Sequence, residues 1–141
     1  MSAGVERLAV GDVVATGGFD VDRDDLVRYA GASGDFNPIH YRDDVATSVG
    51  LPGVLAHGML TMGLAVQPVV ERFGADRIRD YGVRFTRPVP VPPEGSVRLE
   101  IEAKVGQLTD DEARIDVTAR VAGQTVLGRA QVRVALGQQD R

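Results

Sequence analysis

The chain has 141 residues, a length typical of one domain, and 43% of them are hydrophobic, too many for a disordered protein. A formal net charge of -4 argues against a general nucleic-acid binder, because such proteins usually present a basic face. There is no cysteine, so neither a disulfide framework nor a thiolate nucleophile is available. No apolar run approaches the roughly 20 residues that span a bilayer, and the N-terminus lacks an apolar signal core. These features predict one cytoplasmic domain over residues 1–141, with no nucleic-acid or membrane partner.

The chain is expected to open with an arm, a strand and a helix. Residues 1–10 show no clear pattern and are expected to form a loose arm. The stretch from Val13 to Val21 is predicted to be a strand, weakened by its two central glycines. Asp22 is a good N-cap for the helix that follows, which is expected to stop within the stretch 31–34.

The stretch GDFNPIH, residues 34–40, is predicted to be an ordered loop. Pro38 disfavours a helical conformation at Asn37. Asp43 is expected to cap a second short helix that ends at Gly50, and the LPG triplet that follows has turn chemistry. The loop can bring together side chains that a regular helix would hold apart at the same spacing.

The longest helical candidate runs from about His57 to Phe73. Its residues before Glu71 are almost all apolar, which predicts a helix that is buried on most of its sides. Pro68 should kink this helix or end its first half, because proline lacks the N–H that an interior helical position donates.

After Asp76 the pattern changes to a period of two. Apolar residues alternate with mostly polar ones in three successive segments, 97–105, 113–121 and 126–134, which predicts one-sided strands. Short connections favour an antiparallel meander, and 78–86 is expected to be a further strand before a proline-rich bend. We therefore predict an α+β fold in which a curved antiparallel sheet wraps around the long central helix. Its open sheet edges favour a dimer.

One of the chain's two histidines, His40, lies five residues after Asp35. Histidine is the side chain most easily tuned to transfer protons near neutral pH, and a nearby carboxylate can orient it. Gly34 permits a sharp chain path, Pro38 stiffens it, and Asn37 can lock the loop through bonds to the backbone. A hydrogen-bonded loop with a surface histidine is the alternative, but the density of loop-forming and polar residues favours an acid–imidazole site.

The second histidine, His57, precedes Gly58 at the expected start of the long helix. A helix N-terminus offers unpaired N–H groups with partial positive charge, and Gly58 has no side chain to block its own N–H. Such an amide could polarise a carbonyl whose oxygen gains negative charge, although close packing explains Gly58 equally well. For His57 a satisfied core or capping role is favoured. A substrate tunnel could be lined by four residues, which at this spacing are more often core: Phe36, His57, Met59 and Met62.

The sequence contains no established pattern for a metal or cofactor site. Ligands could come from His40, His57, Asp35 and Asp43, but paired-histidine motifs and cysteine are missing. Nucleotide-binding patterns and the GxSxG elbow are also missing, and Ser33 is only a weak nucleophile candidate. We therefore expect neither a metal nor a cofactor.

Three stretches resemble the MaoC-like hot-dog family. YAGASGDFNPIH, residues 29–40, resembles its hydratase-2 motif. AHGMLTMG, from Ala56, resembles the start of the family's central helix, and YGVRFTRPVPVP, from Tyr81, resembles the segment that follows. The resemblance covers about residues 11–136. Among members, the chain looks closest to the beta subunits of actinobacterial (3R)-hydroxyacyl-ACP dehydratases.

The resemblance implies a single hot-dog domain that reversibly hydrates trans-2-enoyl thioesters to (3R)-3-hydroxyacyl thioesters. The carrier would be CoA or acyl-carrier protein (ACP), in fatty-acid or related acyl metabolism. Asp35 and His40 would be the catalytic pair, with no division of base and acid between them. Asn37 and Ser33 would support the loop, and the Gly58 N–H would bind the thioester oxygen. No cofactor is implied, since the thioester itself acidifies C2.

The resemblance also implies a homodimer, or a heterodimer with a second hot-dog subunit, because family sites lie between two such units. Three alternatives stay open: a hot-dog thioesterase, a non-catalytic acyl-binding subunit, and a catalytic subunit that works only with a non-catalytic partner. A thioesterase would usually direct a carboxylate to activate water at the carbonyl carbon. The intact Asp35–Asn37–His40 loop favours hydration over the first two.

Overall fold

One antiparallel sheet organises the chain in a computed structural model that describes residues 7–137 and 140. Its strand order is β1-β3-β4-β6-β2, and the short β5 pairs with β4. The strands are β1 (Val13–Val21), β2 (Ile78–Phe85), β3 (Val97–Leu108), β4 (Glu112–Val121), β5 (Gln124–Thr125) and β6 (Leu127–Ala135). The predicted strands and the antiparallel meander through β3, β4 and β6 are confirmed.

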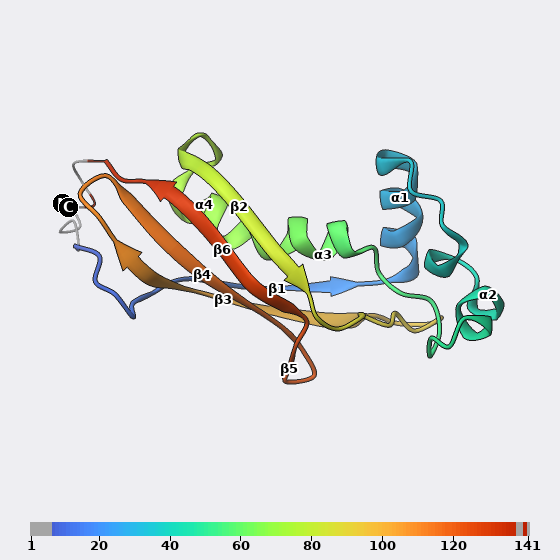
Figure 1. The fold of residues 1–141 in the computed structure, drawn as a ribbon. Coiled ribbons are helices and arrows are strands. Elements are labelled where there is room, and N and C mark those ends of the chain that lie inside the picture. Colours follow the sequence, from blue (N-terminus) through green and yellow to red (C-terminus); the bar gives the residue numbers. More distant parts are fainter. Residues whose placement is uncertain (1–6, 138–139, 141) are drawn as a thin grey trace.

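The helices lie against one side and one end of this sheet (Figure 1). They are α1 (Arg23–Ser33), α2 (Asp43–Ser48), α3 (Gly58–Ala65) and α4 (Gln67–Phe73), with 3-10 turns at Pro38–His40 and Ala75–Arg77. Figure 1 shows α3 and α4 along the sheet, whereas α1 and α2 lie together at one end. The predicted α+β class, with an antiparallel sheet packed against a central helical segment, is confirmed. Within the described residues, no helix is long and apolar enough to cross a membrane.

Local signals explain where α1 begins and ends. The Asp22 carboxylate accepts the Asp25 N–H at 2.9 Å, and the Asp25 carboxylate accepts the Asp22 N–H at 3.0 Å, which forms a capping box. At the other end Gly34 has φ 76°, a left-handed conformation that glycine adopts without strain, and it donates to the Ala30 carbonyl. This stop turns the chain directly into the loop that carries Asp35.

The start of α2 corrects one expectation. Arg42, not Asp43, is the N-cap residue, and it makes no side-chain capping bond. The Asp43 carboxylate instead accepts hydrogen bonds from Arg23 at 2.9 Å and from the Val54 N–H at 3.0 Å. The Arg23 guanidinium thereby holds the pKa of Asp43 below its usual range. Asp43 ties α1 and α2 to the segment before α3, and this tertiary role replaces the predicted cap.

The long central helix is interrupted between α3 and α4. The interruption is at Val66, two residues before Pro68, so the predicted break is confirmed. The expectation that the helix is buried on most sides is wrong for this chain, since Met59 is 58% exposed and Gly63 is also exposed. The sheet covers one side of α3 and leaves the other side uncovered.

The core fills the space between the inner face of the sheet and the helices. Its most buried side chains include Leu99, Ile115, Val132 and Val69. The predicted alternation fails at Leu127, which is 2% exposed although its neighbour Val126 is also buried. The pairing of β2 with β6 shifts register between Gly128 and Gln131, so Leu127 faces inward out of step with the later residues of β6. Val126 and Leu127 both line the cavity described below.

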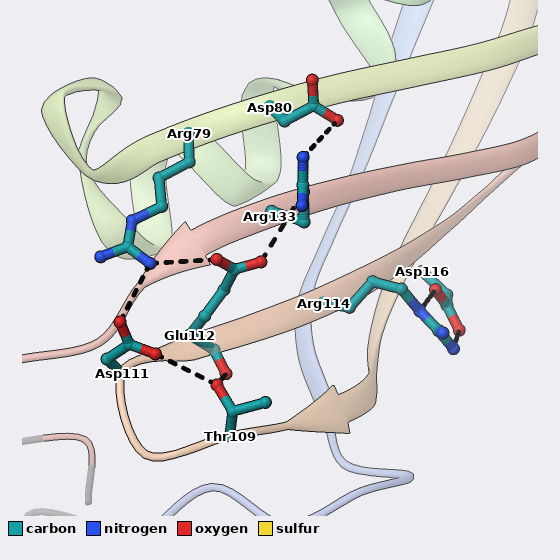
Figure 2. A network of polar contacts seen from close by, with 8 residues as sticks. All are labelled: Arg79, Asp80, Thr109, Asp111, Glu112, Arg114, Asp116 and Arg133. Atoms are coloured by element: carbon teal, nitrogen blue, oxygen red, sulfur yellow. Dashed lines mark hydrogen bonds and ion pairs between the residues drawn. The ribbon is translucent and has the colours of Figure 1, made fainter.

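The exposed face of the sheet is polar, and Figure 2 shows one of its charged networks. Arg79 lies 3.0 Å from the Glu112 carboxylate, and Arg133 lies 3.7 Å from the same group and 3.6 Å from Asp80. Exposed pairs of this kind contribute only about 0–1 kcal/mol each to stability. They keep this face solvated, while burial of the opposite face holds the fold.

The N-terminal stretch is only partly described. Residues 1–6 of the predicted loose arm lie outside the described part of the chain. The rest of the arm is attached, because Leu8 packs against the core and the Ala9 N–H donates to the Asp12 carboxylate at 2.9 Å. The Gly11 N–H then donates to the Val105 carbonyl at 2.8 Å, which aligns the chain for β1.

Candidate active site

Short-range hydrogen bonds hold Asp35 in the loop between α1 and the first 3-10 turn. The Asp35 N–H donates to Ser33 Oγ at 3.1 Å. Asp35 Oδ1 accepts the Asn37 N–H at 3.2 Å, and Asn37 Oδ1 accepts the Ile39 N–H at 3.2 Å. Ser33 and Asn37 therefore lie where loop support was predicted. These bonds occupy Asp35 Oδ1 and leave Oδ2 free to face His40.

His40 presents one ring nitrogen to Asp35 and the other to the backbone. Its Nε2 lies 3.8 Å from Asp35 Oδ2, and its Nδ1 lies 2.8 Å from the Leu55 carbonyl oxygen. A carbonyl oxygen only accepts hydrogen bonds, so the neutral His40 ring carries its proton on Nδ1. Nε2 is then the basic nitrogen. The imidazole is shielded, with 10% of the side chain exposed, whereas the Asp35 side chain is 51% exposed.

The segment 54–56 carries the Leu55 carbonyl and is hydrogen-bonded on two sides. On one side the Leu55 N–H donates to the Ile39 carbonyl at 3.1 Å. On the other side the segment pairs antiparallel with residues 89–91 through two backbone bonds of 2.9 Å. The proline-rich stretch after β2 was predicted only as a bend, and it also supports the wall of the site.

Gly58 begins α3 with an uncapped amide. The N-cap residue, His57, makes no side-chain capping bond, and the first amides bonded to its carbonyl are those of Leu60 and Thr61. The Gly58 N–H is therefore open at the positive end of the helix. A Cβ atom at this position would lie 3.0 Å from Phe85 Cε1, so the ring approaches too closely for a larger residue without a shift.

A cavity of about 270 Å³ lies between His40 and Gly58. Its lining is mostly apolar, with side chains from the region around Leu55, the end of β2 and the start of β6. Polar side chains in the lining come from His40, Thr61, Thr86 and Arg87. The basic nitrogen of an imidazole and an open helix amide therefore border one small, largely apolar space.

Thr61 is a cavity residue that the sequence analysis did not identify. It is 4% exposed and lies one helical turn after Gly58. The hydroxyl of Thr47 bonds the Asp43 carbonyl at 2.9 Å, whereas that of Thr61 makes no such bond within the described residues. The sequence could have indicated Thr61 through its position three residues after Gly58, since residues three apart share one face of a helix.

The four side chains predicted to line a tunnel lie outside this cavity. Phe36 and Met59 are 61% and 58% exposed, because the loop turns one outward and α3 carries the other on its uncovered side. His57 is 1% exposed and lies behind His40. Met62 is partly buried, and its carbonyl accepts the Tyr81 hydroxyl at 2.7 Å. A role for them in a longer substrate channel stays a prediction.

Asp35, His40 and His57 offer donor atoms within 4.8 Å of one another, so a metal site needs consideration. One nitrogen of each imidazole is already committed, His40 Nδ1 to Leu55 and His57 Nε2 to the Asp35 carbonyl at 3.1 Å. The remaining His57 nitrogen is sealed from solvent. This leaves His40 Nε2 and the Asp35 carboxylate, fewer than the three protein ligands of a typical catalytic zinc. That the chain needs no metal stays a prediction.

Comparison with known proteins points to one family. The model described as MaoC like domain matches residues 7–125. The 3-hydroxyacyl-thioester dehydratase X of Mycobacterium tuberculosis (strain ATCC 25618 / H37Rv) is 45% identical over 65 residues, 46% of this chain and 22% of that protein. A solved MaoC-like dehydratase superposes with a TM-score of 0.89 at 34% identity, over 95% of this chain and 42% of its own. The unliganded R-hydratase PhaJ1 of Pseudomonas aeruginosa superposes with a TM-score of 0.78 at 26% identity, over 93% of this chain and 84% of its own.

The chain thus spans less than half the length of the first two of these proteins. The range matched by the family model nevertheless covers most of the chain, and it includes the Asp35–His40 loop and the start of α3. The chain therefore belongs to the MaoC-like domain family.

Proposed function

We propose that the chain is a hydro-lyase that reversibly hydrates trans-2-enoyl thioesters to (3R)-3-hydroxyacyl thioesters. The observation that carries this proposal is that His40 and Gly58 line one cavity, while His40 Nε2 lies 3.8 Å from Asp35 Oδ2. Proton transfer and oxyanion stabilisation are the two demands of the reaction, and these groups can meet both. The names of two relatives, a 3-hydroxyacyl-thioester dehydratase and an R-hydratase, support the same chemistry.

In the hydration direction, water held by Asp35 and His40 adds its oxygen to C3 of the enoyl group. The pair takes one proton from this water and delivers one proton to C2, so the atoms of one water end on C3 and C2. Negative charge passes transiently to the thioester oxygen, where the Gly58 N–H stabilises it. The Thr61 hydroxyl, which has no hydrogen-bond partner among the residues that the structure describes, forms a further hydrogen bond to the substrate. Dehydration retraces these steps.

The cavity fits the reacting end of the substrate rather than its carrier. Its volume of about 270 Å³ is slightly below the roughly 300–1,000 Å³ of pockets that enclose a drug-sized ligand. Arg87 lines this cavity, and its guanidinium donates to the neutral Gln124 side chain at 3.2 Å. Its positive charge can bind the phosphate that CoA and ACP carriers share. No further cofactor takes part.

The working unit in this proposal is a dimer in the cytoplasm, with an identical copy or a second hot-dog subunit. The sheet ends in two edge strands, β1 and β2, that have no further neighbour within the described residues. Phe36, Met59 and Phe85 also expose large apolar side chains, each more than half exposed. A partner that covers them would enlarge the enclosed space beside Asp35 and remove water from the site.

The test is hydration of crotonyl-CoA by the purified chain, followed by loss of the enoyl absorbance. His40→Ala and Asp35→Asn are compared with Asp116→Asn, a matched acid-to-amide change on β4 away from the cavity. Wild type and Asp116→Asn should turn over, and the two site variants should be slower by at least about 100-fold. The product should remain a thioester. Release of free CoA would instead support the thioesterase alternative.

A folded wild-type chain without turnover calls for the partner test. The assay is then repeated with longer enoyl chains, with ACP substrates and with a co-expressed second hot-dog subunit. Activity that appears only with the subunit would identify this chain as the catalytic member of a heterodimer. Inactivity under all these conditions would contradict the proposal and favour a non-catalytic acyl-binding subunit.

A further inference from the structure

His57 lies buried behind the Asp35–His40 pair and contacts both members. Its ring stacks on that of His40, with centroids 3.9 Å apart and 21° between the planes. Its Nε2 lies 3.1 Å from the Asp35 carbonyl oxygen. The Tyr29 ring packs edge-on against the other side of His57, at 4.8 Å between centroids. One inaccessible side chain therefore touches the whole pair without facing the cavity.

The hydrogen bond to Asp35 fixes the chemical state of His57. Because a carbonyl only accepts, Nε2 carries the proton and Nδ1 carries a lone pair. His57 Nδ1 is sealed from solvent and has no hydrogen-bond partner within the described residues. Burial lowers the pKa of His57, which favours the neutral ring.

An apolar ring in place of His57 could stack on His40 without leaving a buried nitrogen unpaired. Unpaired buried polar atoms are unfavourable, so stacking alone does not account for an imidazole here. The property that only the polar ring supplies is the Nε2–H bond to the backbone of Asp35. The contact that requires a polar ring at this position is therefore that bond, beside the stack that any aromatic ring could make.

The position of His57 in the chain links this bond to the other half of the site. His57 is the N-cap residue of α3, and its carbonyl accepts the Leu60 and Thr61 amides at 3.1 and 3.2 Å. Its backbone thus starts the helix whose first residue, Gly58, lines the cavity. Its side chain holds the loop that carries Asp35.

We infer that His57 is a positioning residue that fixes the Asp35–His40 pair relative to the Gly58 amide. It acts through the hydrogen bond to the Asp35 carbonyl and through the stack against His40. This inference rests on the proposed hydratase function, but the structural coupling can be measured without turnover. Because proton transfer depends steeply on geometry, a shift of about 1 Å can slow a reaction about 100-fold.

Two variants separate the two contacts. His57→Phe keeps an aromatic ring against His40 and removes the donor. His57→Gln removes the ring and keeps an N–H donor at a similar reach. Val69→Ala on α4 is the control, because it truncates a fully buried core residue that does not line the cavity.

The expected result is a loss in kcat rather than in KM. His57→Phe should lower kcat about 100-fold while KM changes less than about threefold, since the residue does not touch substrate. His57→Gln should recover at least about tenfold of that loss. Val69→Ala should lower the melting temperature and keep kcat near the wild-type value while folded. Wild-type kcat in His57→Phe, or an equal loss in Val69→Ala, would overturn the inference.

Nuclear magnetic resonance distinguishes failure of this inference from failure of the proposed function. In the wild type the ring of His57 should be neutral with its proton on Nε2, and His57→Phe should shift the backbone amide signals of both Asp35 and Gly58. If these signals move but no enoyl thioester is turned over by the wild type, even with ACP substrates and a second hot-dog subunit, the coupling stands and the proposed function fails. If both signals stay in place in His57→Phe, the coupling is refuted whatever the activity.

Discussion

His40 Nδ1 donates to the Leu55 carbonyl at 2.8 Å, and this contact decides which nitrogen of the imidazole is basic. The acceptor is a backbone atom, so no change of the Leu55 side chain removes it. His40 Nε2 is left as the only nitrogen of this ring that can exchange a proton with Asp35 or a substrate.

His40→Asn tests whether Nδ1 serves as the donor to Leu55 while Nε2 transfers the proton. The asparagine amide can reproduce the Nδ1–H donor to Leu55 but has no basic atom in place of Nε2. The melting temperature should change little, whereas kcat/KM for enoyl hydration should fall by about 10²–10⁴, the usual contribution of a general acid or base. Thermal unfolding and steady-state kinetics measure the two effects. Activity within tenfold of wild type would show that His40 does not transfer the proton.

Gly58→Ala tests the close approach at the start of α3. The new Cβ would lie 3.0 Å from Phe85 Cε1, and the half-exposed Phe85 ring would have to turn and reshape the cavity. We expect kcat/KM to fall about tenfold, a typical effect of displaced contacts around a reacting group, with no loss of stability. Gly31→Ala is the control, because the same change within α1 meets no atom within 4 Å and should leave the rate unchanged.

Thr61→Val and Thr61→Ser separate the hydroxyl from the shape of its side chain. Valine has nearly the same volume but no donor, and the hydroxyl has no internal bond to lose within the described residues. The melting temperature of Thr61→Val should therefore stay the same or rise. One lost hydrogen bond to the substrate corresponds to about a tenfold fall in kcat/KM. Thr61→Ser should remain near wild type. Equal values of kcat/KM in Thr61→Val and wild type would show that the Thr61 hydroxyl does not bind the substrate.

The lowered pKa of His57 makes the stability of the fold depend on pH in a defined window. Its ordinary value is 6.5, and burial lowers it in the folded chain. Below about pH 6.5 the unfolded chain therefore binds a proton that the folded chain resists, so the free energy of unfolding falls as the pH falls. The slope from this one group is at most about 1.4 kcal/mol per pH unit.

Urea unfolding at pH 7.5, 6.5 and 5.5 measures this dependence, and His57→Phe should remove its part of the slope. The lowered pKa of Asp43 does not interfere, because its contribution is lost only as the pH falls below the carboxyl's ordinary value of 3.8. An equal slope in wild type and His57→Phe would show that His57 is not held neutral by the fold.

Features encoded locally were predictable from the sequence. The predicted strand from Val13 to Val21 matches β1 to the residue. Its end could be predicted because Asp22, the next residue, is a typical N-cap for the helix that follows. The alternation of β3 and β4 was equally clear, since each strand buries only one face. Asp35 and His40 could be found together for the same reason, as a single short loop carries both.

Features that depend on distant contacts were not predictable from local pattern. Asp43 gave the signal of a helix cap, but its carboxylate is used by Arg23, twenty residues earlier. The role of His57 depends on the Asp35 carbonyl, 22 residues away, and the tautomer of His40 on a carbonyl 15 residues away. Contacts between residues 15 or 22 positions apart produce no periodic pattern in the sequence from which they could be predicted.

The two-sided hydrogen bonding of segment 54–56 also determines how the site behaves when the molecule opens locally. Exposed loops normally open at low free energy and exchange their amide hydrogens quickly, whereas paired core segments exchange slowly. The Leu55 and Ala56 amides are bonded to the Ile39 and Val89 carbonyls, so they belong to the slow class although they lie outside the named strands. We therefore expect the carbonyl that orients His40 to stay in place during fluctuations that expose the outer turn, so that the imidazole keeps its orientation while the loop around it opens.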